Sequence, residues 1–216
     1  MASKGKSNKL QSYKILESFI QCNYLDGFSY IDKAGEIVNS YVKETKEIPK
    51  FQMGLEGLTL HDVSEKIDAI KVTSTSIWIH FVQPKNLGNV STEATEQIDR
   101  IMKILKPTFF KRIGWRTYFA REDVSSHNPA EKLRIHDGVQ SFALQNFVVA
   151  REFDDVQARL EVSPITNTTD PAKKALLFDV DLAIEIEKLA AKEQLERLRD
   201  VYKSDVFLDA VEELLK

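Results

Sequence analysis

The chain is poor in cysteine and has no long apolar run. Its 216 residues include one cysteine, Cys22, so no intramolecular disulfide and no thiolate metal cluster can form. No stretch approaches the roughly 18 apolar residues that a membrane helix needs. Lys4 and Lys6 are not followed by an apolar segment, so we expect no signal peptide. These absences favour a cytoplasmic protein in a reducing compartment, with no membrane partner.

Motifs that carry a named reaction are also missing. The sequence contains no G-x-G-x-x-G fingerprint, no G-x-x-x-x-G-K-S/T phosphate loop and no G-x-S-x-G elbow. None of the four histidines is spaced four residues from another, as a helical zinc-protease motif requires. Cys22 lies in an apolar run, where a cysteine is usually an inert small hydrophobe. We therefore expect a non-enzymatic protein with no catalytic residue and no cofactor.

One group of side chains in the sequence has the donors of a metal site. Asp179 and Asp181 share one face of an expected strand and, with His136 or Asp137, have the oxygen and nitrogen donors of a divalent-cation site. A metal-dependent enzyme is the hypothesis that follows. Paired carboxylates at a strand end more often serve turns and caps, so the favoured interpretation has no metal.

Composition indicates an ordinary globular protein. Hydrophobic residues make up 43% and charged residues 29% of the chain, and the formal net charge is -3. This charge gives no overall reason to expect nucleic-acid binding, and the basic residues are scattered apart from Lys4, Lys6 and Lys9. We expect residues 1–10 to be a disordered tail and residues 11–216 to form a single α+β domain, with a sub-boundary in the polar loop 122–138.

The most distinctive stretch is a strand expected over residues 109–121. Side chains of a strand alternate between two faces, and here the odd positions are mostly apolar and predict the core face. The even positions place Arg112 and Arg116 on either side of Gly114, which has no side chain to block approach. Arginine forks suit carboxylates and phosphates. The favoured interpretation is that both arginines pair with acidic neighbours; the alternative is a site for an anion or a partner, formed by Arg112, Gly114, Arg116, Tyr118 and Arg121.

Before this strand the sequence predicts alternating strands and helices. Residues 13–24 fit either a helix or a buried strand, and the strand is favoured because turn residues follow it. The further expected elements are a helix over 30–44, a strand over 51–60 broken by two glycines, a strand-rich segment over 70–82 and a helix over 91–105. The parity of apolar residues changes within 73–76, which indicates a bulge or a hairpin. This order predicts a βαββαβ antiparallel sheet with two covering helices. We expect the second half of the chain, or a second subunit, to cover the other sheet face.

The second half is expected to contribute a three-stranded antiparallel segment and C-terminal helices. The strands are expected over 140–150, 155–163 and 174–181, and the helices over 189–202 and 206–215. The middle strand alternates cleanly, so one of its faces should be buried and the other solvated. Asp154 and Asp155 are expected to form the hairpin turn before it.

A few short pieces of the chain stand out together: Ile15-Leu16-Glu17-Ser18, Pro49, Arg112-Ile113-Gly114-Trp115-Arg116-Thr117-Tyr118, Leu177-Phe178-Asp179-Val180-Asp181 and Phe207. These pieces resemble motifs of a sporadically distributed family of uncharacterised bacterial proteins, whose hallmark is close to Arg-Ile-Gly-Leu-Arg-Tyr-x-Asn. Trp115, Thr117 and Phe119 depart from that hallmark. The family has no established activity to carry over, and its patchy distribution implies a mobile-element or defence context.

The sequence thus leads to two functional hypotheses. The first is an interaction module that forms a homo-oligomer and binds a macromolecular partner, in particular a polypeptide, because edge strands can pair with another chain. The second is nucleic-acid or nucleotide binding through the Arg112/Arg116 face, because basic and aromatic side chains on an open sheet can contact phosphates and stack on bases.

Overall fold

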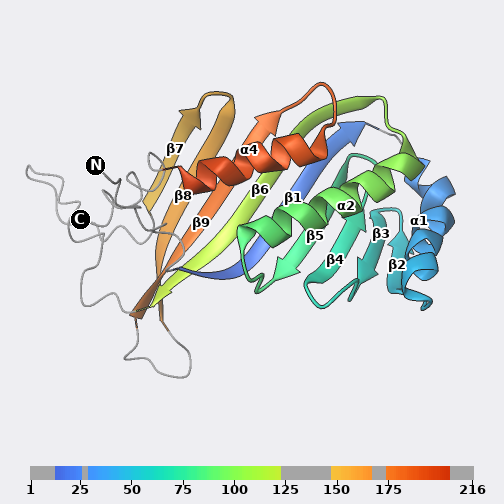
Figure 1. Cartoon of the computed structure of the whole chain (residues 1–216), viewed down its shortest axis with the longest axis horizontal. Coiled ribbons are helices and arrows are strands. Elements are labelled where there is room, and N and C mark those ends of the chain that lie inside the picture. The colour runs from blue at the N-terminus through green and yellow to red at the C-terminus, as the bar shows by residue number, and fades with distance from the viewer. Residues whose placement is uncertain (1–12, 26–28, 123–146, 167–173, 205–216) are drawn as a thin grey trace, which may run out of the picture.

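The computed structural model describes residues 13–25, 29–122, 147–166 and 174–204. These residues form a nine-stranded sheet, antiparallel throughout, with three helices packed on one face (Figure 1). None of these helices is long and apolar enough to cross a membrane. The strands of the first half are β1 (Lys14–Leu25), β2 (Lys50–Gly54), β3 (Gly57–His61), β4 (Ile67–Val72) and β5 (Ser76–Val82). The strands of the second half are β6 (Phe109–Glu122), β7 (Phe147–Phe153), β8 (Val156–Thr166) and β9 (Lys174–Glu185), and the helices are α1 (Ser29–Thr45), α2 (Leu87–Leu105) and α4 (Ala191–Lys203).

The sheet joins the two halves of the chain at its centre. The strand order is β2-β3-β4-β5-β1-β6-β9-β8-β7. β1 therefore lies between β5 and β6, and β6 lies between β1 and β9. The expected α+β class and antiparallel sheet are confirmed. The expectation of a separate three-stranded segment is wrong, because β9 pairs with β6 and continues the same sheet.

Two segments form hairpins in the structure: residues 51–60, which were expected as one strand, and the strand-rich segment 70–82. Residues 51–60 divide into β2 and β3, which pair from Lys50 opposite His61 to Gly54 opposite Gly57. Gly57 has φ +142, and a Cβ there would lie 2.5 Å from the carbonyl oxygen of Val72, so this position requires glycine. The parity change over 73–76 is a β4–β5 hairpin, in which the Thr73 hydroxyl accepts hydrogen bonds from two backbone N–H groups of the turn.

The helix α2 begins earlier than its sequence pattern predicts. The Asn86 side chain accepts a hydrogen bond from the Asn89 backbone N–H at 2.9 Å and caps the helix there, rather than Ser91 or Thr92. The helix ends at Leu105 as expected, and Lys106 adopts a left-handed conformation with φ 53 before Pro107. α1 and α4 match the helices expected over 30–44 and 189–202.

A cluster of buried polar side chains lies where β1 and β6 meet beneath the helices. The Trp115 indole donates to the Ser18 hydroxyl at 2.7 Å, and Ser18 and Thr117 share a hydrogen bond of 2.9 Å. From α4, the Tyr202 hydroxyl donates to the backbone oxygens of Trp115 and Val180 at 2.9 and 3.1 Å. Trp115 and Tyr202 are fully buried. This cluster fixes β1, β6, β9 and α4 to one another, and the odd positions of β6 from Ile113 to Phe119 face the core as expected. A register shift between Asn23 and Tyr24 of β1 reverses the alternation at the start of β6, so the expected core position of Phe109 is wrong: it lies opposite Leu25 and is exposed.

The other face of the sheet has no helix on it in the described part of the chain, and we call it the open face. The described strands of the second half extend the sheet sideways instead of folding over it, so these strands are not the expected cover of this face. β8 alternates as predicted, with Val156, Ala158, Leu160 and Val162 buried against the helices. Asp154 and Asp155 form the turn before β8, as expected.

Some expectations fall outside the described residues. These are the tail 1–10, the loop 122–138 beyond Glu122, the first part of the strand expected over 140–150 and the helix expected over 206–215.

Removing the Ser18 hydroxyl tests the buried polar cluster. In Ser18→Ala the Trp115 indole N–H loses its acceptor in the core, so we expect the free energy of unfolding to fall by about 1–3 kcal/mol. Urea denaturation followed by circular dichroism measures this. Ser40→Ala is the matched control, because Ser40 donates only within its own helix to the Ile37 carbonyl; an equal loss in both variants would contradict the assignment.

Candidate binding face on the open sheet

The structure brings four of the five candidate residues into one row. Arg112, Gly114, Arg116 and Tyr118 lie on the open face of β6, as the alternation predicts. Arg121 does not join them. Its position has the parity of Phe119, and its guanidinium lies 5.7 Å from the ring centre of Tyr13 and contacts the Tyr13 hydroxyl at 3.3 Å. The alternation of strand residues indicates this placement, because the open face of this part of β6 carries even positions and 121 is odd.

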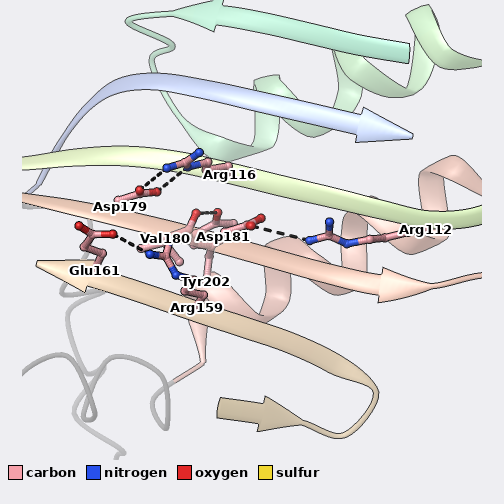
Figure 2. Close-up of polar contacts among 8 residues, drawn as sticks. All are labelled: Arg112, Arg116, Arg159, Glu161, Asp179, Val180, Asp181 and Tyr202. Atoms are coloured by element: carbon pink, nitrogen blue, oxygen red, sulfur yellow. Dashed lines mark hydrogen bonds and ion pairs between the residues drawn. The ribbon is translucent and has the colours of Figure 1, made fainter. Parts of the chain in front are cut away.

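Arg116 is held by a carboxylate of the neighbouring strand. Its Nε and Nη2 donate to the two carboxylate oxygens of Asp179 at 2.8 and 2.5 Å (Figure 2). Asp179 is only 7% exposed. The hydrogen bond to this carboxylate raises the pKa of Arg116 above its ordinary value. The two-point geometry therefore uses the guanidinium fork that the alternative interpretation assigned to a ligand.

Two further ion pairs continue the pattern across the sheet. Arg112 lies 3.7 Å from Asp181, and Arg159 of β8 lies 2.8 Å from Glu161 (Figure 2). Burial raises the pKa of Asp181, and the nearby arginines Arg112 and Arg116 oppose that shift. We call these side chains the ion-pair patch; its members are Arg112, Arg116, Arg159, Glu161, Asp179 and Asp181.

The ion-pair patch confirms that both arginines of β6 pair with acidic neighbours. Gly114 contributes space: a Cβ at this position would come within 3.8 Å of the Arg112 guanidinium, which lies back over the glycine towards Asp181. The contact is of ordinary van der Waals length, so it does not by itself demand glycine. Sequence alternation identified the row of arginines. It did not identify their carboxylate partners, which are more than sixty residues away along the chain.

Beside the ion-pair patch lies a group of apolar and aromatic side chains of which the sequence analysis singled out only Tyr118. Phe19 stacks on His80 with ring centres 4.4 Å apart, and it meets Tyr118 edge to face at 5.9 Å. Trp78 is 41% exposed although it belongs to an interior strand. We call this the aromatic patch: Phe19, Trp78, His80, Val82 and Tyr118. The alternation of β5 was the available signal, because Ile77, Ile79 and Phe81 take the core face.

Carboxylates border the aromatic patch on two sides. Asp68 lies 3.1 Å from Nδ1 of His80, and Glu17 lies 3.5 Å from its Nε2. Glu17 also stands opposite Tyr118 in the β1–β6 register. The rim of the patch therefore carries two carboxylates, and also one cation, Lys71, which stands opposite Trp78 in the β4–β5 register.

The other candidates do not assemble into a reactive site in the described residues. Asp179 and Asp181 each face an arginine, His136 and Asp137 fall outside the described ranges, and no group of three or more metal-ligating side chains occurs in the part that is described. Burial raises the pKa of the Cys22 thiol to about 12, so very little thiolate exists at neutral pH.

A cavity of about 460 Å³ lies at the ends of β6 and β9, lined by Phe110, Lys111, Glu185, Ile186 and Glu187.

Replacing Arg116 tests how strongly the pair with Asp179 holds the sheet. Arg116→Gln leaves a nearly buried carboxylate without its cation, so we expect the free energy of unfolding to fall by about 2 kcal/mol. Arg159→Gln is the matched control, since its pair with Glu161 is more exposed and should contribute less than about 1 kcal/mol. Both are measured by urea denaturation. An Arg159 variant as unstable as the Arg116 variant would contradict the ranking.

Asp181→Asn tests the cost of burying the neighbouring carboxylate. The pKa of Asp181 is raised in the folded protein above its ordinary value of 3.8, so the folded state binds this proton more tightly than the unfolded chain. The group therefore favours folding most at low pH and loses that contribution as pH rises through the folded pKa. We expect the Asn variant to be more stable than the wild type at pH 7, with an advantage that shrinks towards pH 4. Denaturation series at both pH values measure the difference; a variant that is less stable at pH 7 would contradict it.

Comparison with known proteins gives little to carry over. No protein-family model and no curated protein matches the chain. Among solved structures the chain is similar to one described as Methanococcus jannaschii TBP, with 12% sequence identity and a TM-score of 0.35. The similarity covers 88% of this chain and 98% of that chain. A similarity this weak indicates no function for the chain.

Proposed function

We propose that the protein is a non-enzymatic interaction module that self-associates and binds a polypeptide on the open face of its sheet. The observation that carries the proposal is the aromatic patch. A nine-stranded sheet covered by helices on one side leaves Trp78 and Val82 each 41% exposed on interior strands, beside Phe19 and Tyr118. Exposed apolar side chains gathered in this way mark interaction surfaces, whereas apolar residues scattered singly do not.

The charge of the open face favours a polypeptide over a nucleic acid. Its three arginines lie beside carboxylates. The same face of β1, β6, β9 and β8 carries Lys14 besides these three arginines, and it carries five carboxylates: Glu17, Glu161, Asp179, Asp181 and Glu185. Phosphate binding depends on cations that are available to replace counterions. The Asp179 carboxylate occupies Nε and Nη2 of Arg116, so a phosphate at the remaining Nη1 would lie close to a negative charge that repels it.

The chemistry of the face also indicates the partner's character. The aromatic patch offers contact area for apolar or aromatic side chains. The carboxylates at its rim, Glu17 and Asp68, suit lysine or arginine. A polypeptide segment with both kinds of side chain is the partner we propose. The motif resemblance adds a bacterial mobile-element or defence context to this proposal.

Capture by the tagged full-length protein from its native cells tests the proposal. We expect a stoichiometric polypeptide with the wild type and at least a tenfold loss with Trp78→Ala, because truncating a buried interface tryptophan removes about 2 kcal/mol or more of binding free energy. Phe109→Ala is the control: Phe109 is 66% exposed but lies at the start of β6 opposite Leu25, nine positions along the strand from Tyr118 and away from the aromatic patch.

Two results would contradict the proposal. One is a captured polypeptide whose yield is the same with Trp78→Ala. The other is recovery of nucleic acid that disappears in the Arg112→Gln, Arg116→Gln double variant, which would establish the second hypothesis instead. Intrinsic fluorescence adds an independent readout, because Trp115 is buried and acrylamide therefore reaches Trp78 alone of the two tryptophans.

A further inference from the structure

The β2 edge of the sheet carries an unusual concentration of exposed apolar side chains. Nine large apolar residues are well exposed in the described chain, and four of them fall within the eight residues 48–55. They are Ile48, Phe51, Met53 and Leu55, with exposed fractions between 45% and 86%. Phe51 and Met53 lie on the helix side of β2, opposite the buried Leu60 and Leu58 of β3.

This strand also lacks the devices that protect an edge. Edge strands present unpaired N–H and C=O groups and are usually shielded by charged residues, proline or bulges. Within β2 the only charged residue is Lys50, which Asp62 neutralises at 2.7 Å, and its pairing with β3 has no bulge. At the opposite edge, β7 carries the adjacent charges Arg151 and Glu152. The two edges of the same sheet are therefore built differently.

The hairpin that presents β2 is anchored to the body of the protein. The hydroxyl of Tyr30, a fully buried residue of α1, donates to the Leu55 carbonyl at 2.7 Å and lies 3.4 Å from the Gly54 carbonyl. Anchoring the tip limits the conformational freedom that the strand would lose on pairing.

The order of residues in β2 matches a second copy of itself. If two β2 strands pair antiparallel about Gln52, Phe51 of each copy stands opposite Met53 of the other, and Lys50 stands opposite Gly54. Cross-strand apolar pairs stabilise a sheet, whereas like charges directly opposite destabilise it. In this register the two apolar pairs form and no like charges face each other. Gly54 leaves room for the Lys50 side chain and its Asp62 partner.

We propose that two copies of this chain associate through their β2 strands, antiparallel and centred on Gln52, to form one continuous sheet. The inference rests on the self-association proposed above and identifies its surface. The open faces of both copies stay on the same side of the joined sheet. A dimer would then offer two aromatic patches to one partner or to two.

A disulfide at the two-fold axis tests the register. Directly opposite residues of antiparallel strands have Cα atoms about 4.5–5.5 Å apart, within the roughly 4.4–6.8 Å that a disulfide spans. We expect Gln52→Cys to give a reducible dimer on mild oxidation at micromolar concentration, seen by non-reducing electrophoresis. The native Cys22 does not interfere, because it is buried and burial raises its thiol pKa to about 12. Lys50→Cys is the control, since in this register its two copies are about 13 Å apart.

Size-exclusion chromatography with light scattering distinguishes self-association itself from its assignment to the β2 edge. We expect a dimeric mass for the wild type, a monomer for Met53→Glu, and an unchanged dimer for Val148→Glu on the β7 edge. A monomeric wild type would overturn both the self-association and the β2 interface. A wild-type dimer that survives Met53→Glu, or that crosslinks equally through Lys50→Cys, would leave self-association standing and overturn the β2 interface alone.

Discussion

The pairing of β1 with β6 is the interaction on which the rest of the structure depends. It joins two halves of the chain through residues nearly one hundred positions apart, with Ser18 receiving the Trp115 indole N–H and sharing a hydrogen bond with Thr117. A polar group buried without a partner is costly, so the three side chains are stable in the core only in this register. The Tyr202 hydroxyl of α4 bonds to the backbone of β6 and β9 in the same region, so α4 covers the core of the second half.

That register also determines which side chains are exposed on the open face of the sheet. Phe19 stands between His80 on β5 and Arg116 on β6. The aromatic patch and the ion-pair patch are therefore neighbours, because side chains of one strand alternate strictly between the two faces. A shift by one residue at the β1–β6 junction would bury Arg116 and expose Trp115. The core and the candidate binding face are two consequences of one alignment.

In the function we propose, the ion-pair patch disfavours phosphate on this face. Arg116 holds a nearly buried carboxylate through Nε and Nη2, and that negative charge would repel a phosphate beside it. Unpaired, either group would pay a desolvation cost without compensation, so the pair is retained as a unit. What remains accessible is apolar area bordered by Glu17 and Asp68, and this is the surface that we propose binds a polypeptide with apolar and basic side chains. The β2 edge offers a different surface, with apolar side chains and an unpaired backbone, and it suits a second copy of the chain.

The sequence by itself determined the features that depend on local periodicity. Alternation identified the core face of β6 through Ile113 and Trp115, the solvated side of β8 and the row of arginines. Arg121 was expected beside that row, and the structure places it on the opposite face with Tyr13. It could not determine the partners. Nothing near Arg116 specifies Asp179, and nothing near Phe109 shows that β6 lies at the centre of nine strands instead of at the end of a smaller sheet. Strand order arises from hydrogen bonds between segments far apart in the chain, which leave no periodic signal in either segment, so only the tertiary structure decided it.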